Sequence, residues 1–163
     1  FLPGERVARR ARLVGGAGNM RKAPEPREAP DELPPEASLT AAARAASAPG
    51  VAGTCAGQVS YTMRWAARMP PAFPVYPRGS VQEAAGTDED TCALRVVNFI
   101  TPVPMGDVLD FYFTRARNAG FSADHSLQGG DNVLAGRKEG RAFAVYAREL
   151  ASGLVEVDLV TGG

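Results

Sequence analysis

The stretch of sequence that decides the fold is residues 92–121, CALRVVNFITPVPMGDVLDFYFTRARNAGF. In residues 92–100 two sets of side chains alternate, and both are rich in β-branched and aromatic types, which predicts a strand. One set is Cys92, Leu94, Val96 and Ile100, and the other is Ala93, Arg95, Val97 and Phe99. The strand is expected to end at Pro102 and Pro104, because proline cannot donate to a sheet ladder.

A helix is predicted directly after this strand. Pro104 suits its first turn. Acidic residues lie near its start and arginines near its end, as the helix dipole favours; these are Asp107, Asp110, Arg115 and Arg117. The expected apolar stripe is Met105, Val108, Leu109, Tyr112 and Ala116. Gly120 predicts the C-terminal cap, and the apolar Phe121 follows it.

Shorter strands are predicted on both sides of this unit. Residues 81–85 precede it, closed by a hairpin loop at residues 86–90. The three strands expected after the helix are residues 122–126, 132–138 and 141–149, with a fourth at residues 154–160. The two strands before the helix and the first three after it give an expected order of about β-β-α-β-β-β. The sequence therefore predicts an α+β domain, in which one antiparallel β-sheet carries one main helix packed on a face.

The segment before the first strand is rich in proline. Residues 69–77, MPPAFPVYP, hold four prolines, so we expect an extended strap outside the sheet ladder. Residues 60–68 predict a short amphipathic helix with Tyr61, Trp65 and Met69 on one face. The expected divisions of the chain are an N-terminal arm at residues 1–50, the short helix and Pro-rich strap at 51–79, and the α+β domain at 80–163.

The N-terminal arm is a Pro/Ala/Arg-rich tract with seven prolines and one aromatic residue, Phe1. Such a tract buries too little apolar surface to offset the entropy lost on ordering it. Two interpretations are open, a disordered spacer or an extended arm that folds onto a partner. In the second, the arm would contact the partner by charge and by extended-chain recognition. The residues expected to do so are Arg6, Arg9, Arg10, Arg12, Pro24, Pro26, Pro34 and Pro35.

Composition excludes several classes of protein. The 18 acidic and 18 basic residues give a formal net charge of zero, which argues against a nucleic-acid partner. No apolar run approaches the roughly 18 residues of a transmembrane helix, so any membrane contact is expected to be peripheral. Two cysteines and one histidine are too few for a zinc site, and we expect no metal and no cofactor.

No residue pattern supports catalysis. A general base at His125 needs an orienting acceptor, but the adjacent Asp124 would point to the opposite face of a strand. We therefore interpret His125 as a solvent-facing residue. Cys92 has no helix N-terminus or Gly-rich elbow to activate it as a nucleophile. The glycines of residues 15–19 lack the Lys-Ser/Thr of a phosphate loop. We expect that the protein is not an enzyme.

The two cysteines, Cys55 and Cys92, both lie outside the arm. An even number of cysteines in a chain of exported type favours a disulfide. A bridge between them would pin the segment before the domain to the first hairpin, and would stabilise the fold by about 2–4 kcal/mol. The alternative is a pair of buried free thiols.

Four short stretches resemble a known pattern. They are FPVYPRG at residues 73–79, LRVVNF at 94–99, VLDFY at 108–112 and AGF at 119–121. Together they are similar to small exported bacterial domains of secreted proteins and lipoproteins. Those domains show a "YPG" turn, a strand, a helix with an "fY" pair that ends in "aG-aromatic", and further strands. Here Arg78 is inserted in the turn. The resemblance implies an exported, non-enzymatic domain that is often attached to the envelope.

These observations lead to two expected functions. The first is a periplasmic or cell-surface accessory subunit, associated with the outer membrane, that binds a larger envelope assembly through its arm and domain surface. The chain begins at Phe1, and we expect it to have been processed or truncated upstream. The alternative is a domain that binds a small apolar ligand or lipid in a pocket of on the order of a few hundred Å³. The aromatic residues expected around that pocket are Tyr112, Phe113, Phe121, Phe143 and Tyr146.

Overall fold

Eight strands and one main helix make up the part of the chain that the computed structural model describes, residues 20–28, 59–88 and 93–162. The strands form one sheet in the order β1-β5-β6-β7-β8-β4-β3-β2. The strands are β1 (Arg27–Glu28), β2 (Ser60–Tyr61), β3 (Ser80–Thr87), β4 (Leu94–Thr101), β5 (Asp124–Gln128), β6 (Asp131–Lys138), β7 (Arg141–Glu149) and β8 (Val155–Gly162). A 3-10 helix, η1 (Met63–Arg68), precedes β3, and the α-helix α4 (Met105–Asn118) links β4 to β5.

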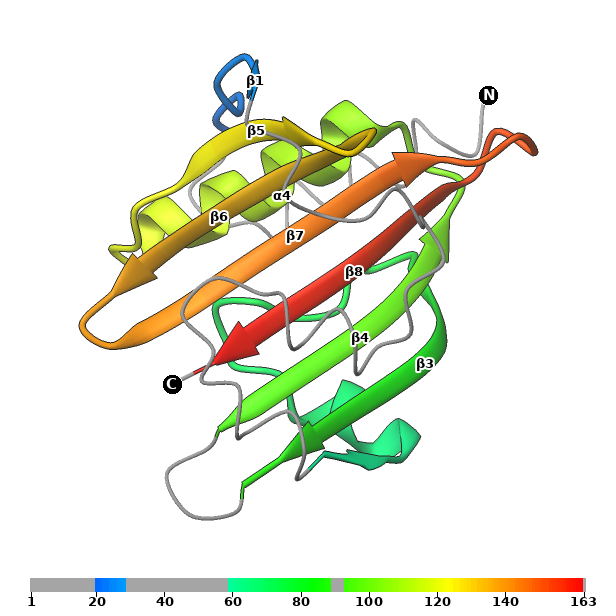
Figure 1. Ribbon diagram of the computed structural model, residues 1–163, viewed down its shortest axis with the longest axis vertical. Helices are drawn as coiled ribbons and strands as arrows, with labels where there is room; N and C mark the ends of the chain where they lie inside the picture. The colour runs from blue at the N-terminus through cyan, green and yellow to red at the C-terminus, as the bar shows by residue number, and fades with distance from the viewer. Residues whose placement is uncertain (1–19, 29–58, 89–92, 163) are drawn as a thin grey trace.

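The sheet is antiparallel except at one edge, where β1 pairs in parallel with β5. The last strand in sequence, β8, lies between β7 and β4. Figure 1 shows α4 running along one face of the sheet, behind β5, β6 and β7. This architecture confirms the expected α+β class. The two strands before the helix and the four after it are all present, with ends that differ only slightly from those predicted.

The alternating pattern of β4 buries side chains on both faces of the sheet. Val97 and Phe99 belong to the main core, which lies between the sheet and α4. Leu94 and Val96 belong to a second buried cluster on the opposite face. A strand that is buried on both faces has a nearly continuous apolar sequence, which is why this stretch predicts its own fold so clearly.

The helix α4 packs through a wider face than the apolar stripe predicts. Its buried residues are Val108, Leu109, Phe111, Tyr112, Thr114 and Ala116. The helix ends in a Schellman cap, in which Phe121 N donates to the carbonyl oxygen of Ala116 at 2.9 Å. Gly120 has a φ of +88°, as this cap requires. The cap directs Phe121 back into the core at the end of the helix.

The helix expected over residues 60–68 is wrong in part. Ser60 and Tyr61 form β2, and Thr62 is extended, with its side chain accepting a hydrogen bond from Arg64 N at 3.4 Å. Helical turns therefore begin only at η1. Trp65 is buried as expected, but Tyr61 is 57% exposed, so the two do not share an apolar face.

Strand β3 is longer than expected. Gly86 and Thr87, which were predicted to lie in a hairpin loop, pair with Arg95 and Leu94 of β4. On its other side Gly86 pairs with Ser60 of β2. This second partner explains why the strand continues to Thr87.

Part of the N-terminal arm lies against the domain. Arg21 N donates to Thr114 Oγ1 at 2.8 Å, and Ala23 N donates to Asp110 Oδ1 at 2.8 Å. The chain then joins the sheet edge as β1. Two of the prolines expected to contact a partner, Pro24 and Pro26, lie in this segment. The other residues of the proposed contact and disulfide lie outside the described residues; they are Arg6, Arg9, Arg10, Arg12, Pro34, Pro35, Cys55 and Cys92.

The chain that follows α4 passes very close to β6 at Ser122, and this approach requires a glycine at position 136. A Cβ atom there would lie 1.7 Å from the carbonyl oxygen of Ser122 and 2.9 Å from Phe143 Cε1. Ser122 N donates to Arg137 O at 3.0 Å, and this hydrogen bond holds the Ser122 backbone against β6. We expect Gly136→Ala to lower the free energy of unfolding by about 3 kcal/mol or more, measured by urea denaturation.

Gly106→Ala is the control for that substitution. Gly106 lies in the first turn of α4, and a Cβ there meets nothing within 4 Å. Because alanine is the better helix former, this variant should be unchanged or more stable by up to about 1 kcal/mol. Equal stability of the two variants would contradict the close approach at Gly136.

Candidate functional site

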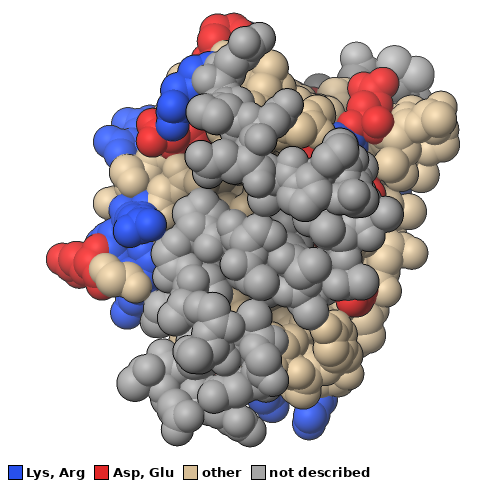
Figure 2. Space-filling view, in the orientation of Figure 1, with Lys and Arg blue, Asp and Glu red and all other residues tan. Residues whose placement is uncertain are grey.

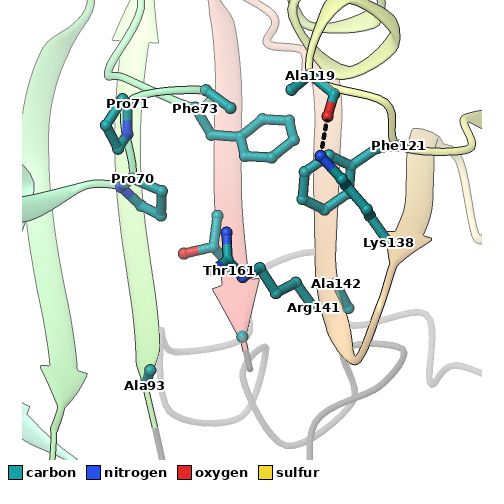
Figure 3. Close-up of a pocket in the computed structure, with 12 residues that line it drawn as sticks. Pro70, Pro71, Phe73, Ala93, Ala119, Phe121, Lys138, Arg141, Ala142 and Thr161 are labelled. Carbon is teal, nitrogen blue, oxygen red and sulfur yellow. Dashed lines mark hydrogen bonds between the residues drawn. The ribbon is translucent and has the colours of Figure 1, made fainter.

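A pocket of about 430 Å³ lies on the helix side of the sheet, at the end where α4 stops (Figure 3). Three parts of the chain wall it: the start of the Pro-rich strap, the end of α4 with its cap, and the hairpin of β6 and β7. The end of β8 lies between them. The lining residues are Pro70, Pro71, Ala72, Phe73, Ala93, Ala119, Phe121, Lys138, Arg141, Ala142, Thr161 and Gly162.

The apolar side of the pocket rests on a cluster of aromatic rings. Phe73 stacks on Phe143 with ring centroids 4.5 Å apart, and meets the edge of Phe121 at 5.1 Å. Phe121 in turn meets Phe143 edge-on at 5.8 Å. These geometries are favourable for aromatic pairs, so the rings form a preformed apolar surface.

The strap that forms one wall is held by side chains of α4. Tyr112 donates its hydroxyl to Pro74 O at 2.7 Å. Arg115 donates through Nε to Ala72 O at 3.0 Å and through Nη2 to Pro71 O. Burial raises the pKa of Tyr112 well above its usual range, so the phenol stays protonated and remains a donor.

The charged groups that line the pocket are cations. Lys138 Nζ donates to Ala119 O at 2.6 Å, at the C-terminus of α4, where the helix dipole favours positive charge. Arg141 is exposed at the start of β7. No acidic residue of the described chain lines the pocket. Figure 2 shows Lys and Arg side chains at the end of the molecule where β6 meets β7, with acidic atoms beside them at the surface.

Thr161 brings an unsatisfied polar group to the same pocket. Its side chain is 3% exposed, and Oγ1 has no hydrogen-bond partner among the described residues. A buried hydroxyl without a partner costs about 1–3 kcal/mol. The pocket therefore combines an apolar surface, two cations and one hydroxyl that lacks a partner.

The aromatic residues expected around a pocket do not all meet. Phe121 lines the pocket, and Phe143 supports it from below through its ring contacts. Tyr112 lies in the same core but away from the lining, and Phe113 is only partly buried there. Tyr146 lies in the cluster on the opposite face of the sheet. The prediction of one enclosed group of five is wrong.

Sequence reasoning missed Lys138, Arg141, Thr161 and Phe73 as members of a site. A signal for the two cations was present, because they flank the turn Glu139–Gly140 and so had to lie together at the tip of one hairpin. Thr161 has the same strand parity as Val157 and Leu159, which marks it as a polar residue at a core position.

The interpretation of His125 as solvent-facing is also wrong. The side chain is 8% exposed, with Nδ1 2.6 Å from Pro24 O and Nε2 2.9 Å from Asn132 Oδ1. Both ring nitrogens are occupied in holding the N-terminal segment to the sheet edge. Asp124 is exposed, on the other face of β5, as expected.

A buried ionic cluster lies on the face opposite the pocket. Arg148 contacts Asp131 at 3.3 Å, Glu156 at 2.9 Å and Asp158 at 3.2 Å. Asn98 donates to both Glu156 and Asp158. Burial lowers the pKa of Arg148, but the three carboxylates outweigh that effect and raise it overall. The cluster thus joins β4, β6, β7 and β8 as a permanently charged structural element.

Comparison of the chain with protein-family models, with characterised proteins and with solved structures found no match. Within residues 20–28, 59–88 and 93–162, no helix is long and apolar enough to cross a membrane. The same residues contain no group of three or more His, Cys, Asp or Glu side chains placed to hold a metal ion.

Tyr112→Phe tests how the strap is held. The variant keeps the buried ring and removes only the hydroxyl that donates to Pro74 O. We expect it to lower the free energy of unfolding by about 1–2 kcal/mol, because that carbonyl loses its partner. The measurement is urea denaturation followed by far-ultraviolet circular dichroism. A variant as stable as the parent would show that this hydrogen bond does not hold the strap.

Thr161→Val tests whether the Thr161 hydroxyl is unsatisfied. Valine keeps the shape and removes the buried oxygen, so we expect the free energy of unfolding to rise by about 1 kcal/mol. Thr114→Val is the matched control with the opposite sign, because Thr114 Oγ1 bonds both Arg21 N and Arg21 O. A loss of stability in both variants would mean that Thr161 has a partner after all.

Proposed function

We propose that this domain is a non-enzymatic binding module whose pocket takes a small, largely apolar ligand. The observation that carries the proposal is the pocket itself, about 430 Å³ in volume and lined by Phe73, Phe121 and small apolar side chains. This volume falls within the range of small-molecule sites in proteins. Its walls are fixed by the α4 side chains and the Schellman cap, so little ordering cost opposes binding.

The polar groups of the domain support a binding role rather than a catalytic one. His125 has both ring nitrogens in hydrogen bonds to Pro24 and Asn132. The ionic cluster around Arg148 lies on the opposite face of the sheet from the pocket. Neither group lies beside the pocket lining, so neither is placed to act on a ligand there.

A second candidate function is the accessory subunit of an envelope assembly. One specific surface favours it: Tyr61 and Met63 are 57% and 52% exposed, next to the exposed Arg64 and Arg68. Aromatic residues, methionine and arginine are enriched in protein interfaces. The resemblance of residues 70–160 to exported bacterial domains supports a location in the cell envelope. Both functions are compatible, because this surface and the pocket use different residues.

The pocket is tested with N-phenylnaphthylamine, an uncharged apolar fluorophore, added to the full chain. We expect saturable binding with one site per chain and a rise in fluorescence. Ala93→Trp places a large side chain at an exposed lining position and should weaken binding by about tenfold or more, because it occupies the pocket.

Ala151→Trp is the matched control, since Ala151 is exposed in the turn between β7 and β8 and is not part of the pocket lining. It should bind the fluorophore as the parent does. Binding that is unaffected by Ala93→Trp would place the fluorophore elsewhere and would contradict the proposed function.

A further inference from the structure

The pocket has positive charge that no described acidic residue of its lining neutralises. Lys138 and Arg141 come from the two strands of one hairpin, and no acidic side chain of the described residues lines the pocket with them. The charge of Lys138 is directed to the carbonyl oxygen of Ala119, 2.6 Å away. Arg141 makes no hydrogen bond or ion pair within the described part of the chain. Its guanidinium is therefore available to water or to a bound anion.

Arg141 and Thr161 line the same pocket. Figure 3 shows the Arg141 side chain extending along the pocket toward Thr161. Thr161 Oγ1 is buried and lacks a partner among the described residues, so an acceptor placed there would satisfy it. Two independent observations, an uncompensated cation and an unsatisfied hydroxyl, thus point to an oxygen-bearing anion.

The charge available in the pocket indicates which anion fits. The forked guanidinium of Arg141 matches the two oxygens of a carboxylate, which accepts such charge-assisted bonds. A phosphate monoester carries nearly two negative charges, which one exposed guanidinium would only partly neutralise. On the other side, the rings of Phe73 and Phe121 and the small side chains beside them offer contacts only to an apolar body.

Building on the ligand-binding function above, we propose that the pocket selects an amphipathic monocarboxylate. Its apolar body lies against Phe73 and Phe121, and its carboxylate meets Arg141 and Thr161. The class includes short fatty acids and aryl-alkyl acids.

The test compares three ligands that share one alkyl chain and differ in charge, namely octanoate, octanamide and octylammonium. Binding to the full chain is measured at neutral pH by calorimetry, and the position of each ligand is followed by the backbone amide NMR shifts of Phe121, Thr161 and Gly162. We expect octanoate to bind about tenfold more tightly than octanamide, and octylammonium to bind most weakly. Added salt should weaken octanoate alone.

Arg141→Gln removes the rim charge at an exposed position, where folding is not at risk. It should weaken the binding of octanoate by about fivefold, because an exposed ion pair contributes only about 1 kcal/mol. The affinity for octanamide should stay within about twofold of the parent's. Arg137→Gln is the control: it makes the same change of charge on the same hairpin, but Arg137 does not line the pocket. It should leave both ligands unchanged within about twofold.

The outcomes separate the inference from the function on which it rests. If octanamide binds as tightly as octanoate, with shifts at the pocket residues, the proposed selection of a carboxylate is wrong. The proposed apolar ligand-binding function would still hold. An equal effect of Arg141→Gln and Arg137→Gln would show long-range attraction only, and would also overturn the selection of a carboxylate. If none of the three ligands shifts the pocket residues and N-phenylnaphthylamine does not bind, both proposals fail.

Discussion

The arrangement of this domain depends on hydrogen bonds between the Pro-rich strap and α4. With four prolines in residues 69–77, the strap cannot join a sheet ladder, yet its carbonyl oxygens still need partners. Tyr112 and Arg115, one turn apart on α4, supply donors to Pro74, Ala72 and Pro71. The helix is thereby tied to a segment on one side and to the sheet on the other. Phe73 enters the core between them.

This tie determines where a pocket forms. Because the strap is fixed along α4 and the Schellman cap turns the chain at Gly120, Phe73 and Phe121 are brought edge to face over Phe143. Beyond the last turn of the helix, the pocket lies beside these rings, on the side of the β6–β7 hairpin. The hairpin contributes its charged residues to this opening because Lys138 caps the helix through Ala119.

The fold was predictable from the sequence because its signals are local. The alternation in residues 92–100 and the 3.6-residue spacing after Pro104 depend only on near neighbours. The elements that sequence reasoning missed depend on distant ones. His125 is buried because the segment around Pro24, far away in the chain, lies against it and places the Pro24 carbonyl oxygen 2.6 Å from its Nδ1. The pocket combines five separate segments, at residues 70–73, 93, 119–121, 138–142 and 161–162, which only the tertiary fold brings together.

One wrong prediction could have been avoided from the sequence alone. Phe143 and Tyr146 are three positions apart on one strand, so they had to face opposite sides of the sheet. Counting strand parity would have kept Tyr146 out of the expected pocket. The 3-10 helix is different, since nothing in residues 60–68 excludes an α-helix. What delays its start to Met63 is the pairing of β2 with β3, which is a tertiary contact.

The position of β8 has a consequence for how the chain folds as it is made. Residues 155–162 are the last strand in sequence but lie in the middle of the sheet, between β7 and β4. Until the ribosome has released them, β4 and β7 each present an unpaired edge next to apolar side chains, and such edges promote aggregation. The nascent domain therefore cannot complete its core before synthesis of β8, and it needs protection during that interval.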